Sequence, residues 1–234
     1  MSPRGGEQFT QIKLNKIERG MRETRLLGIL LFSAYMTMLS GAASGAVEGE
    51  WRLVRQEHGV EVYRRPFNDS EIPELRGRTH FNASVGNVYR VISDYDHFSD
   101  FIPMVSDSRV LKRDARAIWV YQRLGMPSPI TDRHYVIKVV DDLHAAPTGI
   151  IDVTWWMDGA RSMSLASDDA IIPDAFSGSW HLQDLASQGD CYAVYTIHVD
   201  PAGVLPGWLF ASMSERYVIQ VMNAVRKRIG INRE

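Results

Sequence analysis

A turn rich in proline and glycine, followed by a long amphipathic segment, constrains the fold of this chain more than any other feature. The turn is Asp200-Pro201-Ala202-Gly203-Val204-Leu205-Pro206-Gly207-Trp208, and it follows an alternating apolar run. Proline presets φ and glycine tolerates positive φ, while Pro206 stands where the first turn of a helix loses no hydrogen bond. The sequence therefore predicts a strand that ends near Asp200 and a final helix that begins near Pro206.

The predicted final helix has a broad apolar face. Its apolar side chains recur at steps of three and four residues, which is the spacing of an amphipathic helix. They are Leu209, Phe210, Met213, Tyr217, Val218, Val221, Met222, Val225 and Ile229. Most such faces are buried in a protein core. The pattern by itself leaves open whether the helix completes a solid core or covers a ligand cavity.

The rest of the chain beyond residue 50 is dominated by segments typical of strands. Strands are expected at residues 51–55, 59–65, 75–83, 105–112, 117–124, 133–143, 149–158, 176–185 and 191–200. Short helices are expected at residues 85–93 and 96–101, and loops at residues 66–73 and 159–175. Helices that bracket a run of consecutive strands indicate an α+β fold with an antiparallel sheet.

Five short segments, in chain order, resemble the START family, whose name stands for StAR-related lipid transfer. They are Gly59-Val60-Glu61-Val62-Tyr63, Val91-Ile92-Ser93-Asp94-Tyr95, Met126-Pro127-Ser128-Pro129-Ile130-Thr131-Asp132-Arg133, Gly178-Ser179-Trp180-His181-Leu182 and the turn before the final helix. The resemblance covers about residues 51 to 230. It implies a helix-grip fold of the Bet v 1-like superfamily: a curved antiparallel β-sheet wrapped around a long C-terminal α-helix, with two short helices after the first strands. It also implies a lipid tunnel between helix and sheet.

A tract from Asp94 to Pro103 is similar to the bacterial polyketide-cyclase and quinone-chaperone branch of the same superfamily. At two positions the chain departs from the family pattern. Ala202 stands before Gly203 where many relatives carry a second glycine, which is a conservative change, and His134 follows Arg133 where many relatives carry aspartate. A ligand-orienting acid is therefore not carried over to that position. The fold is supported by more residues than the choice of ligand.

Alternation along the strands selects the side chains that face the predicted helix. The strand at residues 117–124 is ambiguous, because Trp119 and Tyr121 compete with Ile118 and Val120. Aromatic and methionine side chains suit an irregular apolar ligand, although they also fill solid cores. The predicted ligand-binding set is Tyr121, Arg133, Tyr135, Trp155, Met157, Tyr195, Phe210, Met213, Tyr217 and Val221. Within it, Tyr121, Arg133 and Tyr195 are expected to contact a polar end of the ligand.

Catalytic and metal-binding motifs are scarce in the sequence. It contains no Gly-x-Ser-x-Gly, no phosphate loop and no His-Glu-x-x-His, and its seven histidines lack the spacing of metal ligands. We therefore expect neither cofactor nor metal, and a protein that is not an enzyme. Asp132 and His134 are the acid–base candidates for the alternative of a cyclase-like or aromatase-like enzyme. An ion pair between Asp132 and Arg133 is the structural alternative, and a ligand sensor without transport is a third reading.

The N-terminal region has the pattern of an export signal. Residues 26–46 contain no charged side chain, Arg22 and Arg25 precede them, and small residues at Ser44 and Ala46 fit cleavage before Val47. The n-region is long, so Met21 is a second candidate for the true start. We expect residues 1–46 to be a signal peptide and residues 47–234 a START-like domain that is exported to the periplasm. The alternative is a membrane anchor formed by residues 26–46.

Charge and cysteine content narrow the range of partners. Of 26 basic and 28 acidic residues, six and three lie in residues 1–46, so the remainder carries 20 and 25, a net charge of −5. Such a balance does not favour nucleic acid, and it favours transient over permanent contact with membranes. Cys191 is the sole cysteine, so no disulfide forms within the chain. We expect a monomer, stabilised by packing, that binds one lipid or other hydrophobic molecule and carries it across an aqueous compartment.

Overall fold

The protein is described by a computed structural model at residues 50–68, 70–185, 189–203 and 207–231. The predicted signal segment lies outside these residues. The strands are β1 (Arg52–Glu57), β2 (Val60–Phe67), β3 (Ser70–Phe81), β4 (Val105–Arg113), β5 (Ile118–Leu124), β6 (Asp132–Asp142), β7 (Ile150–Met157), β8 (Ala170–Ile171), β9 (Ala175–Leu185) and β10 (Asp190–Asp200). The helices are α2 (Val85–Ile92), α3 (Phe98–Phe101), α4 (Gly159–Ser164) and α5 (Gly207–Ile231), with single 3-10 turns at Tyr95–His97 and Ala146–Thr148.

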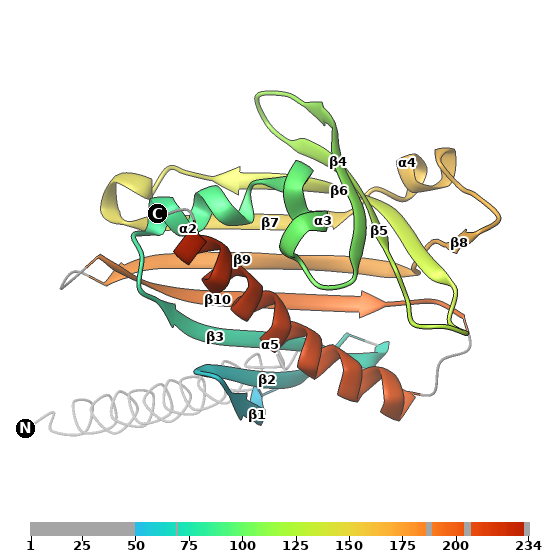
Figure 1. Cartoon of the computed structure of the whole chain (residues 1–234), viewed down its shortest axis with the longest axis horizontal. Helices are drawn as coiled ribbons and strands as arrows, with labels where there is room; N and C mark the ends of the chain where they lie inside the picture. Colours follow the sequence, from blue (N-terminus) through green and yellow to red (C-terminus); the bar gives the residue numbers. More distant parts are fainter. Residues whose placement is uncertain (1–49, 69, 186–188, 204–206, 232–234) are drawn as a thin grey trace, which may run out of the picture. The chain divides into compact units, whose positions relative to one another are not determined.

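One curved sheet forms the body of the described chain, and α5 lies against it (Figure 1). The strand order is β1-β2-β3-β10-β9-β7-β6-β5-β4, and all neighbours along this path are antiparallel. Two short helices, α2 and α3, follow the first three strands as predicted. This arrangement confirms the predicted α+β helix-grip fold. Among the described helices, none has the length and apolar character needed to cross a membrane.

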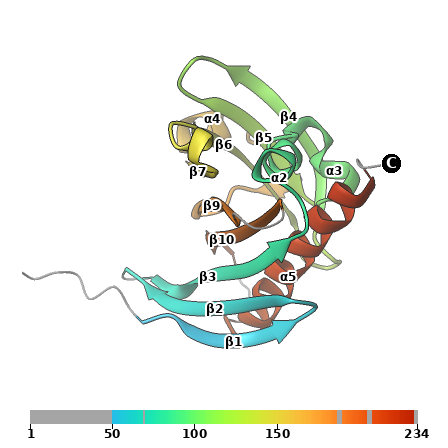
Figure 2. The same ribbon diagram turned by 90° about the vertical axis from the view of Figure 1, so that its left-hand side faces the viewer.

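The long helix α5 is held close to one side of the sheet, where it contacts β3 and β2 and also α2 and α3 (Figure 2). Because Gly77 of β3 has no side chain, α5 can approach the sheet closely at this position. A Cβ atom at Gly77 would lie 2.5 Å from Sδ of Met222 and 2.6 Å from Cγ1 of Val218, both on α5. The missing side chain therefore lets the helix seat on β3, while the sheet curves away toward β5, β6 and β7.

Two predicted loops carry regular structure instead. The segment 66–73 is a tight hairpin in which Phe67 pairs with Ser70 and Asn68 has a φ of 45°. Its polar composition concealed the strand that begins at Ser70. The segment 159–175 contains α4, capped by the Asp158 side chain, and β8, which pairs in parallel with β6. Because this pairing joins segments far apart in sequence, local pattern did not reveal it.

Strand β5 is buried on both faces, which explains its ambiguous sequence pattern. Ile118 and Val120 belong to the core under α5. On the opposite face, Trp119 and Tyr121 form a second apolar cluster with Ala117 and Val136. Helix α4 packs near β6 on this second face. There Ser162 of α4 accepts a hydrogen bond from the backbone N–H of Val136 at 2.9 Å, and Asp158 accepts one from Nε1 of Trp119 at 3.0 Å.

Candidate ligand-binding pockets

Two adjacent apolar pockets that share lining residues lie between α5 and the sheet in the described part of the chain. The inner pocket, of about 60 Å³, is bounded by the segment from α2 to α3, by strands β4, β5, β6, β7, β9 and β10, and by the second half of α5. The outer pocket, of about 80 Å³, is bounded by the first half of α5 and by the loops before β4, after β5 and before β9. Together they follow the helix along the core of the domain.

Three aromatic side chains separate the two pockets. Tyr135 of β6, Phe176 of β9 and Tyr217 of α5 line both of them. The rings of Tyr135 and Phe176 stack with their centroids 4.3 Å apart. We call these three residues the aromatic partition. An engineered cavity of about 150 Å³ holds benzene. Each pocket alone is therefore too small for an alkyl chain, and a lipid has to displace the partition.

Most of the predicted ligand-binding residues meet at these pockets. Those that line one or both are Arg133, Tyr135, Trp155, Tyr195, Phe210, Met213, Tyr217 and Val221. Met157 pairs with Ile137 on the core side of the sheet, packs against the core and lines neither pocket. Tyr121 lies on the opposite face of β5, where Arg109 stacks 4.2 Å from its ring centroid. Its predicted contact with ligand is a wrong assignment, because β5 has two buried faces.

Arg133 has a structural task at the edge of the outer pocket. Its guanidinium donates hydrogen bonds to the carbonyl oxygens of Pro201 and Ala202, both at 2.9 Å, and to that of Thr131. Only 3% of the residue is exposed, and burial lowers its pKa. These bonds fix the turn before α5. The guanidinium therefore directs three of its five N–H donors to backbone carbonyls, while the side chain remains part of the lining of the outer pocket.

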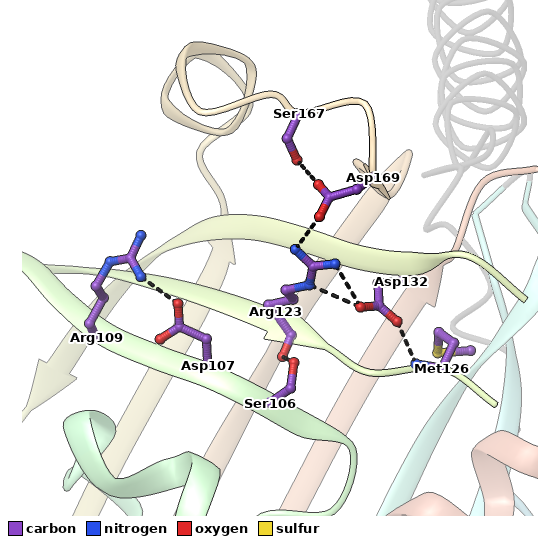
Figure 3. A network of polar contacts seen from close by, with 8 residues as sticks. All are labelled: Ser106, Asp107, Arg109, Arg123, Met126, Asp132, Ser167 and Asp169. Carbon is purple, nitrogen blue, oxygen red and sulfur yellow. Dashed lines mark hydrogen bonds and ion pairs between the residues drawn. The ribbon is translucent and has the colours of Figure 1, made fainter. Parts of the chain in front are cut away.

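Asp132 forms its ion pair with a different arginine from the one considered in the sequence. Its carboxylate accepts hydrogen bonds from Nε of Arg123 at 2.9 Å and from the backbone N–H of Met126 at 2.9 Å (Figure 3). These two contacts hold the pKa of Asp132 below its usual range. Arg123 also reaches Asp169, at 2.9 Å, in the segment between α4 and β8. The cluster thus joins three segments on the outer side of the sheet.

His134 also lies away from the pockets. It is 1% exposed, its ring is 6.0 Å from that of Tyr121, and its Nε2 has no hydrogen-bond partner among the described residues. Burial is the main reason why its pKa is lowered. The two acid–base candidates of the enzymatic alternative therefore occupy the face opposite the pockets. Within the described part of the chain, no group of three or more His, Cys, Asp or Glu is placed to hold a metal ion.

Sequence reasoning missed Phe176 and Gln122, which line the inner pocket. Phe176 alternates in phase with Trp180 on β9, so strand periodicity contained the signal. Gln122 is buried on β5, and its Oε1 accepts a hydrogen bond from the Tyr135 hydroxyl at 3.2 Å. It shares the face of Val120, so the ambiguity of β5 concealed it.

The wall of the inner pocket is rich in aromatic groups with polar atoms. The ring of Tyr195 packs against those of Trp155 and Trp180, with centroid distances of 5.8 and 4.6 Å. Gly178 leaves the space that the Trp155 ring occupies, because a Cβ there would overlap the indole. Burial raises the pKa of Tyr195 well above its usual value and also raises that of Tyr217. Both phenols therefore stay protonated and neutral at physiological pH.

Comparison with known proteins places this geometry in context. The family model described as "Polyketide cyclase / dehydrase and lipid transport" matches residues 81–226. An uncharacterized protein of Pseudomonas aeruginosa is 27% identical over 190 residues, which is 78% of this chain and 88% of that protein.

Solved structures share the fold at low sequence identity. A STAR-related lipid transfer protein fragment from Xanthomonas axonopodis superposes with a TM-score of 0.68 at 23% identity, over 76% of this chain and 98% of the fragment. Human StAR-related lipid transfer protein 5 superposes with a TM-score of 0.71 at 14% identity, over 86% of this chain and 94% of that protein. An aromatase/cyclase from Streptomyces superposes with a TM-score of 0.52 at 16% identity, over 69% of this chain and 95% of that protein. At these identities the likeness establishes the architecture alone.

Proposed function

Because this chain belongs to the polyketide cyclase/dehydrase and lipid transport family, we propose that it binds one lipid or similar hydrophobic molecule beneath α5 and carries it through an aqueous compartment. Family and fold together support hydrophobic ligand binding, lipid transfer or a cyclase-like role. The main observation in support of a carrier is the pair of adjacent apolar pockets under α5.

Enclosure is what makes such a carrier energetically effective. Each buried methylene contributes about 0.8 kcal/mol, so a sixteen-carbon chain gains about 12 kcal/mol. Association costs about 4 to 15 kcal/mol, so a useful affinity requires nearly the whole chain to leave water. The two pockets can enclose most of such a chain only if they merge into one cavity. In our proposal the aromatic partition swings aside when ligand enters.

The outer pocket is the proposed entrance. It is lined by side chains from connecting segments, among them Met104, Met126 and Pro173, and by Phe210 and Met213 in the first half of α5. Loops and helix ends open more readily than the centre of a sheet. The second half of α5 is seated on β3 and serves as the fixed end. Ligand entry would then require a movement of the first turns of α5, away from these loops.

The carrier reading is favoured over an enzymatic one by the position of the acid–base candidates. Asp132 and His134 lie on the opposite face from the pockets, whereas tyrosines with raised pKa values line the inner pocket. A cyclase would need a group that exchanges protons near neutral pH at the ligand. We therefore propose a binding protein without catalysis.

We also propose that the protein works outside the cytoplasm, as a monomer that touches membranes transiently and has no nucleic-acid partner. The uncharged segment 26–46 and the small residues before Val47 support export. N-terminal sequencing of the protein recovered from its native compartment tests this part. A mature chain that starts at Val47 is expected, and retention of residues 26–46 in a membrane fraction would refute cleavage.

Mass spectrometry of organic extracts, combined with vesicle-to-vesicle transfer, tests the proposed function. We expect about one apolar molecule per purified protein and accelerated lipid exchange between vesicles. Met213→Trp fills the outer pocket and should abolish exchange, whereas Met163→Trp, at a position that is 66% exposed on α4, should leave it unchanged. Bound lipid without exchange would favour a sensor. Chemical conversion of the bound molecule would favour the enzyme, and the absence of any bound molecule and exchange would refute the carrier.

A further inference from the structure

Two buried polar atoms at the inner pocket have no hydrogen-bond partner. Tyr95, in the 3-10 turn after α2, is 4% exposed, and Trp155, on β7, is 7% exposed. Both side chains line the inner pocket. The hydroxyl of Tyr95 and Nε1 of Trp155 make no hydrogen bond within the described chain. A buried donor without a partner is costly, so such atoms call for a physical explanation.

The surroundings of these atoms disfavour an anionic group. The side chains that line the inner pocket include phenols, indoles and one amide, and none of them is charged. Near Tyr95, the carboxylate of Asp141 accepts a hydrogen bond from the Tyr89 hydroxyl at 2.7 Å. Burial, and then the charge of Asp141, raises the pKa of Tyr95, so its phenol stays neutral. A carboxylate or phosphate in this pocket would lose its water without gaining a cation.

An uncharged oxygen matches this chemistry. The indole N–H of Trp155 can only donate a hydrogen bond, whereas the Tyr95 hydroxyl can donate or accept. A carbonyl oxygen can accept a hydrogen bond from either donor, and a hydroxyl group can pair with either of them. The inner pocket is too small for a chain in its present shape, so ligand entry has to move its walls and can bring these atoms into contact with the ligand.

We propose that the inner pocket is a polar subsite for a carbonyl or hydroxyl oxygen at the end of an uncharged hydrophobic ligand, held by Tyr95 and Trp155. This inference rests on the proposed binding of a hydrophobic molecule beneath α5 and deepens it. It assigns the ligand class as neutral ketones, quinones or alcohols, in preference to free fatty acids. The oxygen lies at the closed end of the site, and the apolar remainder extends through the aromatic partition toward the outer pocket.

Competition binding with matched probes tests the subsite. Hexadecan-2-one, hexadecane and hexadecanoate share a sixteen-carbon chain, and each is delivered from cyclodextrin to displace Nile red from the protein. The measured quantity is the ratio of the ketone affinity to the alkane affinity within each variant, which cancels changes in pocket volume. The variants are Tyr95→Phe and Trp155→Phe. Tyr192→Phe is the matched control, since Tyr192 lies beside His80, 5.2 Å between ring centroids, and lines none of the pockets described.

For the unmodified protein we expect the ketone to bind about tenfold more tightly than the alkane, the size of one good neutral hydrogen bond. The acid should bind more weakly than the ketone. The preference should fall to about twofold in Tyr95→Phe and Trp155→Phe and persist in Tyr192→Phe. Equal ratios in all four proteins, or tightest binding of the acid, would overturn the subsite while leaving the carrier intact. Failure of all three probes to bind would overturn the proposed function and the subsite together.

Discussion

Adding one methyl group at Gly77 should weaken the seat of α5 on the sheet. In Gly77→Ala, the new Cβ would lie 2.5 Å from Sδ of Met222 and 2.6 Å from Cγ1 of Val218. Contacts between such atoms are normally about 3.5 to 4.0 Å. The helix or both side chains must therefore move by about 1 Å. Met222 is flexible and can rotate, whereas Val218 is β-branched, fully buried and stiff.

The expected cost follows from these displacements. Overpacking a well-filled core typically costs about 1 to 3 kcal/mol. Alanine is favoured over glycine by about 0.5 to 1 kcal/mol within a regular element, which offsets part of that penalty. The free energy of unfolding should therefore fall by about 1 to 2 kcal/mol. For a domain of this size, the melting temperature should fall by about 2 to 8 °C.

Thermal and urea unfolding of residues 47–234 would measure this change. Gly86→Ala is the matched control, because a Cβ at Gly86 meets nothing within 4 Å and this residue lies in α2. It should be neutral or slightly stabilising. The double variant Gly77→Ala with Val218→Ala should be less destabilised than the sum of the single variants, since the smaller side chain makes room. Unchanged or raised stability in Gly77→Ala would show that α5 does not press on β3 at this point.

Three further predictions concern the pockets, pH and the single thiol. Phe176→Ala should join the two pockets and lower the free energy of unfolding by about 3 to 5 kcal/mol, and added lipid should restore part of this loss. Calorimetry with and without lipid measures both effects. A variant that lipid fails to stabilise would contradict the prediction. Because the pKa of Asp132 is depressed, its contribution is present above its unfolded pKa of about 3.9 and is lost as pH falls through the folded value. Asp132→Asn should therefore lower the melting temperature at pH 7, and this difference should disappear as pH falls through the depressed folded-state pKa of Asp132. A difference independent of pH would exclude this linkage. Burial raises the pKa of the Cys191 thiol to about 12. Ellman's reagent at pH 8 should thus label it only after denaturation, and rapid labelling of the native protein would show that β10 opens.

The turn before α5 and the strand periodicities predicted the order of the elements and an α+β fold with an antiparallel sheet, whereas the helix-grip arrangement was predicted from the resemblance to the START family. The nine expected strands and three expected helices all occur in the described structure, because their patterns are local consequences of chain geometry. The alternation of inward and outward side chains along β7 and β10 also placed Trp155 and Tyr195 on the pocket side of the sheet. Errors arose where local pattern carries little information: in the polar hairpin around Asn68, and in β8, whose pairing with β6 links distant segments.

The sequence by itself therefore determined the order of the elements, the amphipathic character of the final helix α5 and the apolar character of the space beneath that helix. Tertiary structure decided which side chains share that space. Arg133 was recognised as inward-facing, yet only the folded chain brings it to the carbonyls of Pro201 and Ala202. Tyr121 could not be assigned from alternation, because α4 returns to cover the second face of β5 and β6. The size of the pockets and the aromatic partition also depend on contacts between residues from different strands and α5, and no local pattern encodes such distances.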